Sequence, residues 1–246
     1  MNTDRLKRYA PQARQDFIAA ITRQAARYGI TAQEVALAER AGDVILINGT
    51  PYPAAIAASR AALVSLIEQQ GFSQTMEQAA YSWFNRLCAI RFMELHGYLD
   101  HGRRVLSHPE RGSGFQILDD CLDIDLPGLD KNKVRELKLN GNQDEALYRE
   151  LLLAQCHALH QAMPFLFEPV DDATELLLPD NLTKTDSLIQ ALITAIPEED
   201  WANIEIIGWL YQFYISEKKD EVIGKVVKSE DIPAATQLFT PNWIVK

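Results

Sequence analysis

Helical spacing of apolar residues recurs along most of this chain of 246 residues, and it limits the fold more than any other feature. In residues 11–29, Phe17, Ile21 and Ala25 recur every four positions, which gives the segment one apolar face and one Arg-rich face. We expect this helix to begin at Pro11 and to end at Gly29. Similar spacing predicts helices over residues 53–70, 73–96, 143–162 and 187–196, and two more within residues 198–227. The predicted fold class is therefore mainly α, a multi-helix domain.

Two short segments depart from this pattern. Residues 44–47 form a β-branched run, and the Asn48-Gly49 pair after it suits a tight turn, so we expect at most a small β-hairpin near residues 43–52. Thr31, followed by Glu34 three positions later, is typical of a capping box and predicts a second short helix there.

The spacing of Gly and Pro suggests how the chain is divided. Residues 98–129 are dense in Gly, Pro, Ser and charged residues, which predicts an irregular joint. We expect a helical subdomain at 1–97, the joint at 98–129, a second helical subdomain at 130–235, and a separate C-terminal segment at 236–246.

Charge is distributed unevenly over a chain whose formal net charge is −10. Residues 1–28 carry six Lys and Arg against two Asp, whereas residues 171–206 carry nine acidic residues against Lys184 alone. One interpretation is that these are solvated helix faces. The other is a basic N-terminal arm that faces an anionic partner such as DNA, for which the candidate residues are Arg5, Lys7, Arg8 and Arg14.

The cysteines and the apolar runs indicate a compartment. The three cysteines are odd in number and far apart, which is typical of reduced thiols in a cytoplasmic protein. No apolar run approaches the roughly 18 residues of a membrane span, and no apolar stretch of a secretory signal follows the basic N-terminus. We therefore expect a cytoplasmic protein with no membrane partner.

Signatures of enzyme chemistry are scarce in the sequence. There is no phosphate-binding loop and no nucleophile elbow. Cys156, His157 and His160 could gather on one helix, but a zinc site needs about four ligands and no second pair has ligand spacing. A structural role for these three residues is favoured over a small metalloenzyme, and no metal and no catalytic residue are assigned.

The last residues, LFTPNWIVK, have the chemistry of a helix start. Thr240 is a suitable cap and Pro241 suits the first helical position, yet the sequence ends at Lys246. Two alternatives follow from the residues alone: a short tail docked on the domain, or the edge of something longer.

Two stretches carry a more specific pattern. WFNRLCAIRFMELHGYLD at 83–100 and IEIIGWLYQFYISEKKDEVIGK…IPAATQLFTPNWIVK at 204–246 together resemble the N-terminal region of the adenine-specific DNA methyltransferases of bacterial BREX phage-defence systems, the PglX family. The resemblance extends over all 246 residues. It implies a helical N-terminal region, with 236–246 as the truncated start of a catalytic domain.

The resemblance also implies a cofactor and partners. In such enzymes the Thr-Pro segment lies against S-adenosylmethionine, which makes Phe239, Thr240 and Pro241 candidate cofactor residues, with Trp243 and Ile244 as apolar support. The glycine-rich cofactor turn and the Asn-Pro-Pro-Tyr loop that holds a flipped adenine come later in these enzymes and are not in this sequence. We expect no methyl transfer and no bound cofactor from this chain alone. The implied partners are DNA, through the intact enzyme, other BREX proteins, and a phage antagonist that mimics DNA.

Both stretches also have a simpler interpretation. Arg86 and Arg91 could contact phosphates, but pairing with acids across the helix bundle is favoured. The aromatic face of Trp209, Phe213 and Tyr214 is typical of a core, or of a contact with an absent catalytic domain. The alternative function is a self-contained helical interaction module, used for assembly of the defence complex or captured by a phage antagonist.

Overall fold

A long helix at the N-terminus organises the fold in this computed structural model, which describes residues 2–164, 167 and 172–216. Helix α1 (Thr3–Arg27) is capped by Asn2, whose side chain accepts hydrogen bonds from the backbone N–H groups of Asp4 and Arg5. The expected start at Pro11 was wrong, because Pro11 lies inside the helix. A proline in a helix costs about 3 kcal/mol, which is offset here by a continuous buried face on both sides of it: Leu6, Ala10, Ala13 and Phe17.

The small sheet extends the predicted hairpin by one strand. Strands β1 (Ala38–Ala41), β2 (Val44–Ile47) and β3 (Thr50–Pro53) are antiparallel in the order β1-β2-β3, with Ile45 opposite both Arg40 and Tyr52. Asn48 and Gly49 both have positive φ, 50° and 76°, as a tight hairpin turn requires. The predicted class, mainly α with a small hairpin, is confirmed.

The second short helix expected at Thr31 was wrong. The Thr31 hydroxyl does accept a hydrogen bond from the backbone N–H of Glu34, at 3.1 Å. However, the Thr31 N–H also donates to the Glu34 carbonyl, and Ile30 forms a bridge with Val35. These bonds turn the chain back on itself into a tight loop.

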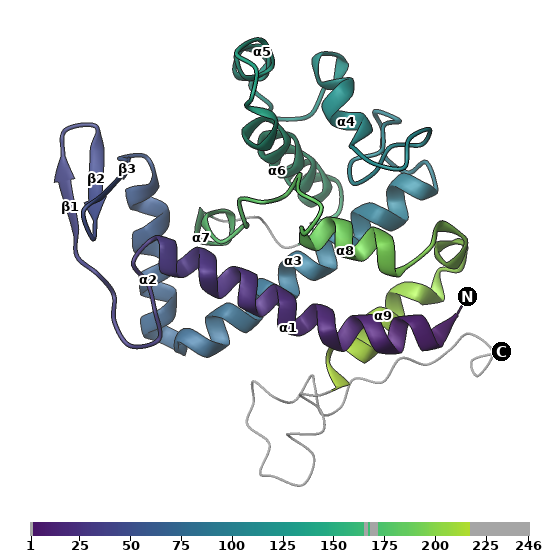
Figure 1. Cartoon of the computed structure of the whole chain (residues 1–246), viewed down its shortest axis with the longest axis horizontal. Helices are drawn as coiled ribbons and strands as arrows, with labels where there is room; N and C mark the ends of the chain where they lie inside the picture. The colour runs from purple at the N-terminus through teal and green to yellow at the C-terminus, as the bar shows by residue number, and fades with distance from the viewer. Residues whose placement is uncertain (1, 165–166, 168–171, 217–246) are drawn as a thin grey trace, which may run out of the picture.

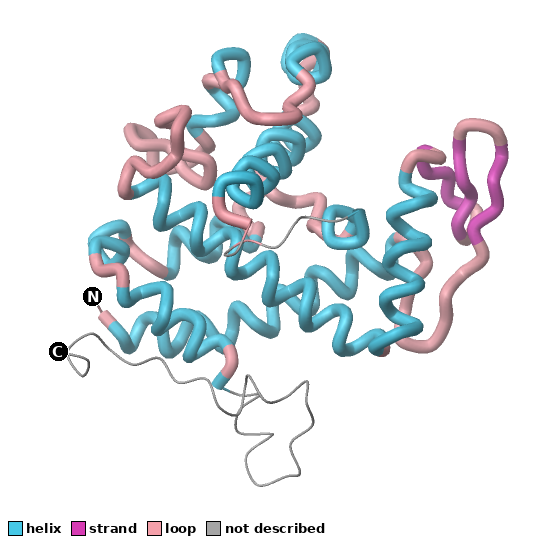
Figure 2. The backbone as a smooth tube through the Cα atoms, turned by 180° about the vertical axis from the view of Figure 1, so that it is seen from behind, coloured by secondary structure: helices cyan, strands magenta, loops and turns pink. Residues whose placement is uncertain are grey.

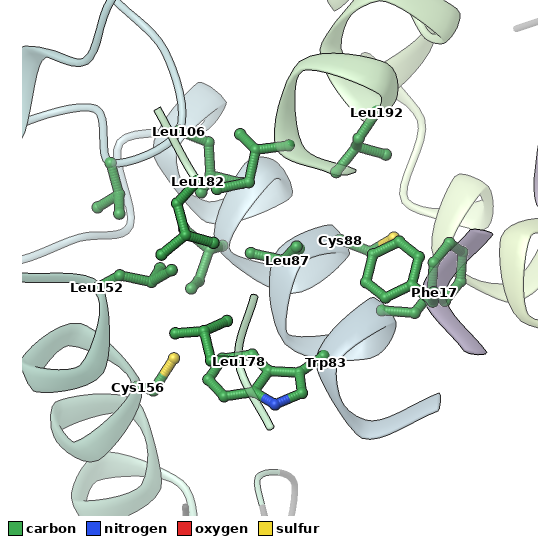
Figure 3. Packing of buried hydrophobic residues seen from close by; sticks show 14 of the residues in the cluster. Phe17, Trp83, Leu87, Cys88, Leu106, Leu152, Cys156, Leu178, Leu182 and Leu192 are labelled. Atoms are coloured by element: carbon green, nitrogen blue, oxygen red, sulfur yellow. The ribbon is translucent and has the colours of Figure 1, made fainter. Parts of the chain in front are cut away.

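Helix α3 (Phe72–Leu95) lies at the centre, behind α1 in Figure 1. Helix α2 (Ile56–Gln70) precedes α3, and the sheet lies beside α2 at one end of the molecule. At the other end, the N-terminus of α1 lies beside α9 (Glu205–Tyr214). Trp83, Phe84 and Leu87 of α3 are almost completely buried. Figure 3 shows Trp83 and Leu87 among side chains from distant segments, including Phe17, Leu152 and Leu178.

Residues 98–129 are mostly irregular, as predicted, and contain the short helices α4 (Gln116–Asp119) and η1 (Cys121–Asp123). Val105, Leu106 and Ile117 are fully buried in the same apolar cluster as Trp83 and Leu152. The division into two helical subdomains stays a prediction, and residues 236–246 lie outside the described part.

The remaining elements are α5 (Lys131–Leu139), α6 (Asp144–Ala162), α7 (Asp172–Leu176), α8 (Leu188–Ala195) and η2 (Glu198–Ala202). Helices α4, α5 and α6 lie at one side of the molecule (Figure 2), whereas α7 packs against α2 and α8 against α1. Among the described residues, none of the helices has both the length and the apolar content to cross a membrane.

Candidate functional site

The predicted cofactor residues Phe239, Thr240 and Pro241 lie outside the described residues, so their contribution to a cofactor site stays a prediction. The described part of the chain contains the other predicted site, the basic N-terminal arm. It also contains the two charged residues of the Arg-Phe-Met-Glu stretch, Arg91 and Glu94.

Arg5 is held by acids of the same chain. Its Nη1 lies 3.4 Å from Oδ2 of Asp200 and 3.9 Å from Oε1 of Glu199, both in η2. The backbone N–H of Asn2 donates to Asp200 Oδ1 at 2.8 Å, and the Asp200 side chain is only 5% exposed. The start of α1 is therefore fastened to η2, and the charge of Arg5 is already compensated.

The other three cations of the predicted arm differ in accessibility. Arg14 forms an ion pair with Glu77 of α3 and is largely buried. Lys7 and Arg8 are exposed on the first turns of α1, where Arg8 Nε donates to the Asp4 carbonyl at 3.3 Å. Of the four predicted DNA-binding residues, Lys7 and Arg8 thus face solvent, and the role of all four stays a prediction.

Further along α1, Arg27 pairs with Asp180, which also lies 3.6 Å from Arg149 of α6. Both ends of the basic helix therefore contact the acidic region 171–206. The uneven charge seen in the sequence serves, in part, to join two segments of the same molecule.

A buried carboxylate lies where α3 meets the irregular segment. Glu94 Oε2 accepts hydrogen bonds from the backbone N–H groups of Val105 and Leu106, both at 2.7 Å. Glu94 Oε1 accepts from Arg91 at 2.6 Å and from the Ser107 hydroxyl at 3.0 Å. With four donors on a side chain of 0% exposure, this carboxylate fixes the path of residues 105–107.

Arg91 extends this network to η2. Its Nη1 also donates to the Ser107 hydroxyl at 2.7 Å, and its Nη2 lies 3.2 Å from Glu198 Oε1. Arg104 makes two hydrogen bonds to the same Glu198 carboxylate, at 2.6 and 3.3 Å. The expectation that Arg91 pairs with acids across the bundle is confirmed. We call these five residues the Arg91 network: Arg91, Glu94, Arg104, Ser107 and Glu198.

The network also sets the ionisation of Glu198. Burial on its own raises the pKa of this carboxyl, but the hydrogen bonds and charge of Arg104, followed by Arg91, lower the pKa overall. Glu198 is therefore held in its charged form.

Arg86 lines a cavity that the sequence analysis missed. Its Nη1 donates to the Ser82 hydroxyl at 2.8 Å, and its guanidinium lies 5.4 Å from the centre of the Trp83 ring. The cavity, of about 130 Å³, lies between α2, α3 and α7, with Leu63 and Leu177 opposite the polar side chains of α3. The signal that could have revealed it is a polar stripe at helical spacing on α3: Thr75, Gln78, Ser82 and Arg86.

Cys156, His157 and His160 do not form a site with one another. The Cys156 thiol is buried, and burial raises its pKa to about 12, so it stays protonated and unreactive. His157 Nε2 lies 2.9 Å from Glu175 Oε1, whereas His160 Nδ1 donates to the Phe167 carbonyl at 2.7 Å. Within the described ranges no cluster of His, Cys, Asp or Glu could hold a metal ion.

The aromatic face of α9 is only partly enclosed. Leu210 and Tyr214 are buried, and Tyr214 stacks on Phe84 with 4.3 Å between ring centres. Trp209 and Phe213 stack on each other at 5.5 Å and are half-buried. The core interpretation is confirmed for Leu210 and Tyr214, and Trp209 and Phe213 also pack against this core, whereas a contact of the aromatic face with a catalytic domain stays a prediction.

No family model matches this chain. Two curated proteins are similar to it along its whole length. The chain is 60% identical to the adenine-specific methyltransferase BrxX of Escherichia coli O9:H4 (strain HS), of which it covers 21%. It is 35% identical to the adenine-specific methyltransferase PglX of Lacticaseibacillus casei (strain Zhang), of which it covers 22%.

The chain thus spans about a fifth of the length of these relatives. The two stretches from which the resemblance was predicted lie in this matched region, since the match includes every residue of the chain. The resemblance predicted from the sequence is confirmed: over its full length, the chain is similar to part of the adenine-specific methyltransferases BrxX and PglX.

Proposed function

We propose that this chain is a helical, non-catalytic domain of a site-specific DNA adenine-N6 methyltransferase of a BREX phage-defence system. The observation that carries the proposal is the whole-chain match to BrxX at 60% identity, over a fifth of that protein. The domain would support the catalytic part of the enzyme, which acts in the cytoplasm with other BREX proteins as partners.

The chemistry of the reaction would belong to the larger enzyme. Methyl transfer to adenine requires a flipped base and S-adenosylmethionine as methyl donor. Phe239, Thr240 and Pro241 would supply one edge of the cofactor site. Because the described titratable groups that are buried, such as Glu94 and Arg91, are committed to structural bonds, they would hold this domain in shape instead of moving protons in catalysis.

A contact with the DNA backbone would use Lys7 and Arg8, the two exposed cations of the predicted arm. Each phosphate contact contributes about −0.9 to the slope of log K against log salt concentration. Anisotropy titrations of residues 1–246 with a plain DNA duplex, between 50 and 200 mM salt, test this. Replacement of Lys7 or Arg8 by Ala should each reduce the slope by about 1. Arg135→Ala, an exposed cation on α5, is the control and should leave the slope unchanged.

Arg5 and Arg14 should behave differently from Lys7 and Arg8 in that experiment. Because both form ion pairs within the chain, their Ala variants should lower the melting temperature of the domain. Equal loss of DNA affinity in all four variants, with no loss of stability, would contradict the assignment of Lys7 and Arg8.

A second candidate function is an interaction module for the defence complex, or a target for a phage antagonist that mimics DNA. The net charge of −10 and the internal pairing of Arg5 and Arg14 favour it over a DNA contact. No binding to duplex at 50 mM salt, together with tight binding to another BREX protein, would support the module. Steep loss of DNA affinity with salt would support the DNA contact.

A further inference from the structure

The small sheet has two edges that differ in their backbone chemistry. It lies at one end of the molecule, where β1 and β3 flank the central strand β2 (Figure 1, Figure 2). Each outer strand bonds to β2 through alternate residues, and the residues between them direct their backbone N–H and C=O groups away from the sheet. What each edge can bind therefore depends on which residues point outward.

The edge of β3 is closed by prolines. The N–H of Ala54 donates to the Asp43 carbonyl at 2.9 Å, in register with the ladder between β2 and β3, so these two residues form a hydrogen-bonded pair. Such pairs alternate along antiparallel strands, so Tyr52 bonds to β2 whereas Pro51 and Pro53 direct their backbone nitrogens outward. Because proline has no N–H, this edge offers another strand no donor at either position.

The edge of β1 is open. The residues of β2 that do not bond to β3 bond to β1, where their partners are Glu39 and Ala41. Ala38 and Arg40 therefore direct their backbone groups outward, and no described residue bonds to these groups. All four residues of β1 are exposed. An approaching strand would find two N–H donors and two carbonyl acceptors here.

The side chains at this edge indicate which strand would fit. Opposite residues of a ladder share one face of the sheet, so Arg40 lies on the same face as Ile45, which is 3% exposed. Glu39 lies on the other face, together with Leu46. Leu37, directly before β1, is 84% exposed. An added strand would thus meet a base on one face, an acid on the other and an apolar side chain at one end.

A second copy of the chain fits this edge poorly. In an antiparallel pair of identical strands on a twofold axis, one residue lies opposite itself. An axis at either central residue of β1, Glu39 or Arg40, would place like charges directly opposite each other, which is destabilising. An axis at Ala38 would need the backbone of Ala36, whose N–H already donates to the Gly29 carbonyl at 2.7 Å. Each copy also has a formal net charge of −10, so a different protein is the better occupant.

We propose that the edge of β1 binds an extended segment of another protein, which joins the sheet as a fourth strand antiparallel to β1. The segment has a basic side chain opposite Glu39, an acidic side chain opposite Arg40 and an apolar side chain beside Leu37. Backbone hydrogen bonds to Ala38 and Arg40 supply the affinity, and the charged pairs fix the register. This surface goes beyond the proposed function, because its chemistry is the same whether or not the domain belongs to a methyltransferase.

The probe is a synthetic peptide, Thr-Val-Glu-Lys-Val-Val. When it pairs antiparallel with residues 37–42, its Glu lies opposite Arg40 and its Lys opposite Glu39. A peptide with the Glu and Lys exchanged has the same composition and is the matched control. A third peptide is N-methylated at the two positions that face Ala38 and Arg40, which removes its donors to the edge. Backbone amide shifts of residues 1–246, measured by NMR, report binding.

Two variants of one residue test the edge from the side of the domain. Ala38→Pro removes an outward N–H and keeps the bonds of Glu39 and Ala41 to β2. Ala38→Thr keeps the N–H and is the matched control. We expect the first peptide to shift the amides of residues 37–42 at millimolar concentration, and Ala38→Pro to weaken its binding at least tenfold, with less than a twofold change for Ala38→Thr.

The exchanged and the N-methylated peptides should each bind at least tenfold more weakly than the first. Absence of shifts with the first peptide at millimolar concentration would overturn the proposal. So would equal binding of the three peptides, or equal binding by Ala38→Pro and Ala38→Thr.

Amide hydrogen exchange tests the open edge without a peptide, and it remains informative if Ala38→Pro does not fold. In the unmodified chain, the amides of Ala38 and Arg40 should exchange at least tenfold faster than those of Glu39 and Ala41, which bond to β2. Equal protection of all four amides would overturn the proposal, since another part of the chain or a second copy would then cover the edge. A dimer in analytical ultracentrifugation that Ala38→Pro dissociates would identify the second copy. Neither readout uses methyl transfer, so this proposal and the proposed function can fail separately.

Discussion

The two stretches that resemble the methyltransferases are held in the domain by different chemistry. In residues 83–100, Trp83, Arg91 and Glu94 are 1%, 1% and 7% exposed, and their polar atoms bond to distant parts of the chain. In the described part of the second stretch, the buried residues Leu210 and Tyr214 are held by apolar packing, while Ile204 is 65% exposed. A distinctive sequence can therefore mark a polar connection as well as an apolar anchor.

The difference follows from the chemistry of each stretch. Arg91 and Glu94 carry charges that cannot be buried without partners. Glu94 therefore accepts hydrogen bonds from the backbone N–H groups of residues 105 and 106, and Arg91 pairs with the carboxylate of Glu198. The residues that anchor α9 lack charge, so they need apolar neighbours and no particular polar partner. The first stretch fixes the path of residues 105–107, and the second attaches α9 to the core.

The largest effect is expected from removal of the buried carboxylate. Glu94→Ala leaves two backbone N–H groups without their acceptor and removes the buried one of the two acidic partners of Arg91. Breaking a buried ion pair in this way costs about 3–5 kcal/mol. Urea unfolding followed by circular dichroism measures the change, with exposed Glu68→Ala on α2 as the control, expected to change stability by less than about 0.5 kcal/mol. A loss below about 1 kcal/mol for Glu94→Ala would show that the network is dispensable.

A comparison within α9 separates its two faces. Leu210→Ala removes a side chain that is 1% exposed and should cost about 2–5 kcal/mol. Ile207→Ala, at a residue that is 36% exposed, should cost about 1 kcal/mol or less in the same chain. Urea unfolding of both variants measures the difference. Equal losses would contradict the difference in burial between Leu210 and Ile207.

A smaller effect is expected where the start of α1 meets η2. Asp200→Asn keeps the shape of the side chain but removes the charge that faces Arg5 and weakens the acceptor of the Asn2 N–H. We expect a loss of about 1–3 kcal/mol, since hydrogen bonds that involve a charged group contribute that much. Amide hydrogen exchange of residues 2–8 should rise at the same time. Unchanged exchange in these residues would contradict the conclusion that Asp200 holds the start of α1 against η2.

The smallest effect concerns Glu198 and depends on pH. Because the pKa of Glu198 is lowered in the folded domain, its ion pairs stabilise the fold above the ordinary carboxyl pKa and lose this effect as the pH falls through the lowered value. The carboxylate is about half exposed, so Glu198→Gln should cost less than about 1 kcal/mol at pH 7. The difference from the unmodified chain should begin to shrink below the ordinary carboxyl pKa of about 4.3 and approach zero only below the lowered pKa of Glu198. A difference that is constant with pH would rule out a charge effect.

Local patterns predicted the local structure well. The period of apolar residues located α1, α2, α3, α6, α8 and α9, and Asn48-Gly49 located a turn whose positive φ angles the structure confirms. The exceptions are sites where a tertiary contact outweighs a local signal. Pro11 marks a typical helix start, yet burial of Leu6 and Ala10 extends the helix past it.

The long-range contacts could not be predicted in the same way. Arg91 meets Glu198 across 107 positions, and no spacing rule connects them. We expected Arg91 to pair with an acid across the helix bundle, but no pattern in the sequence identifies which acid. The sequence likewise could not show that Arg5 is paired while Lys7 and Arg8 are exposed, because this depends on η2 lying beside the start of α1.

Hydrogen exchange measured on the Glu94→Ala variant and on the unmodified chain tests the central comparison most directly. The Glu94 carboxylate accepts hydrogen bonds from the Val105 and Leu106 N–H groups. We predict that these two amides exchange much faster in the variant, while amides of residues 206–214, which are held by apolar packing, change little. Equal exchange of the Val105 and Leu106 amides in the two proteins would contradict the claim that the buried carboxylate fixes this segment.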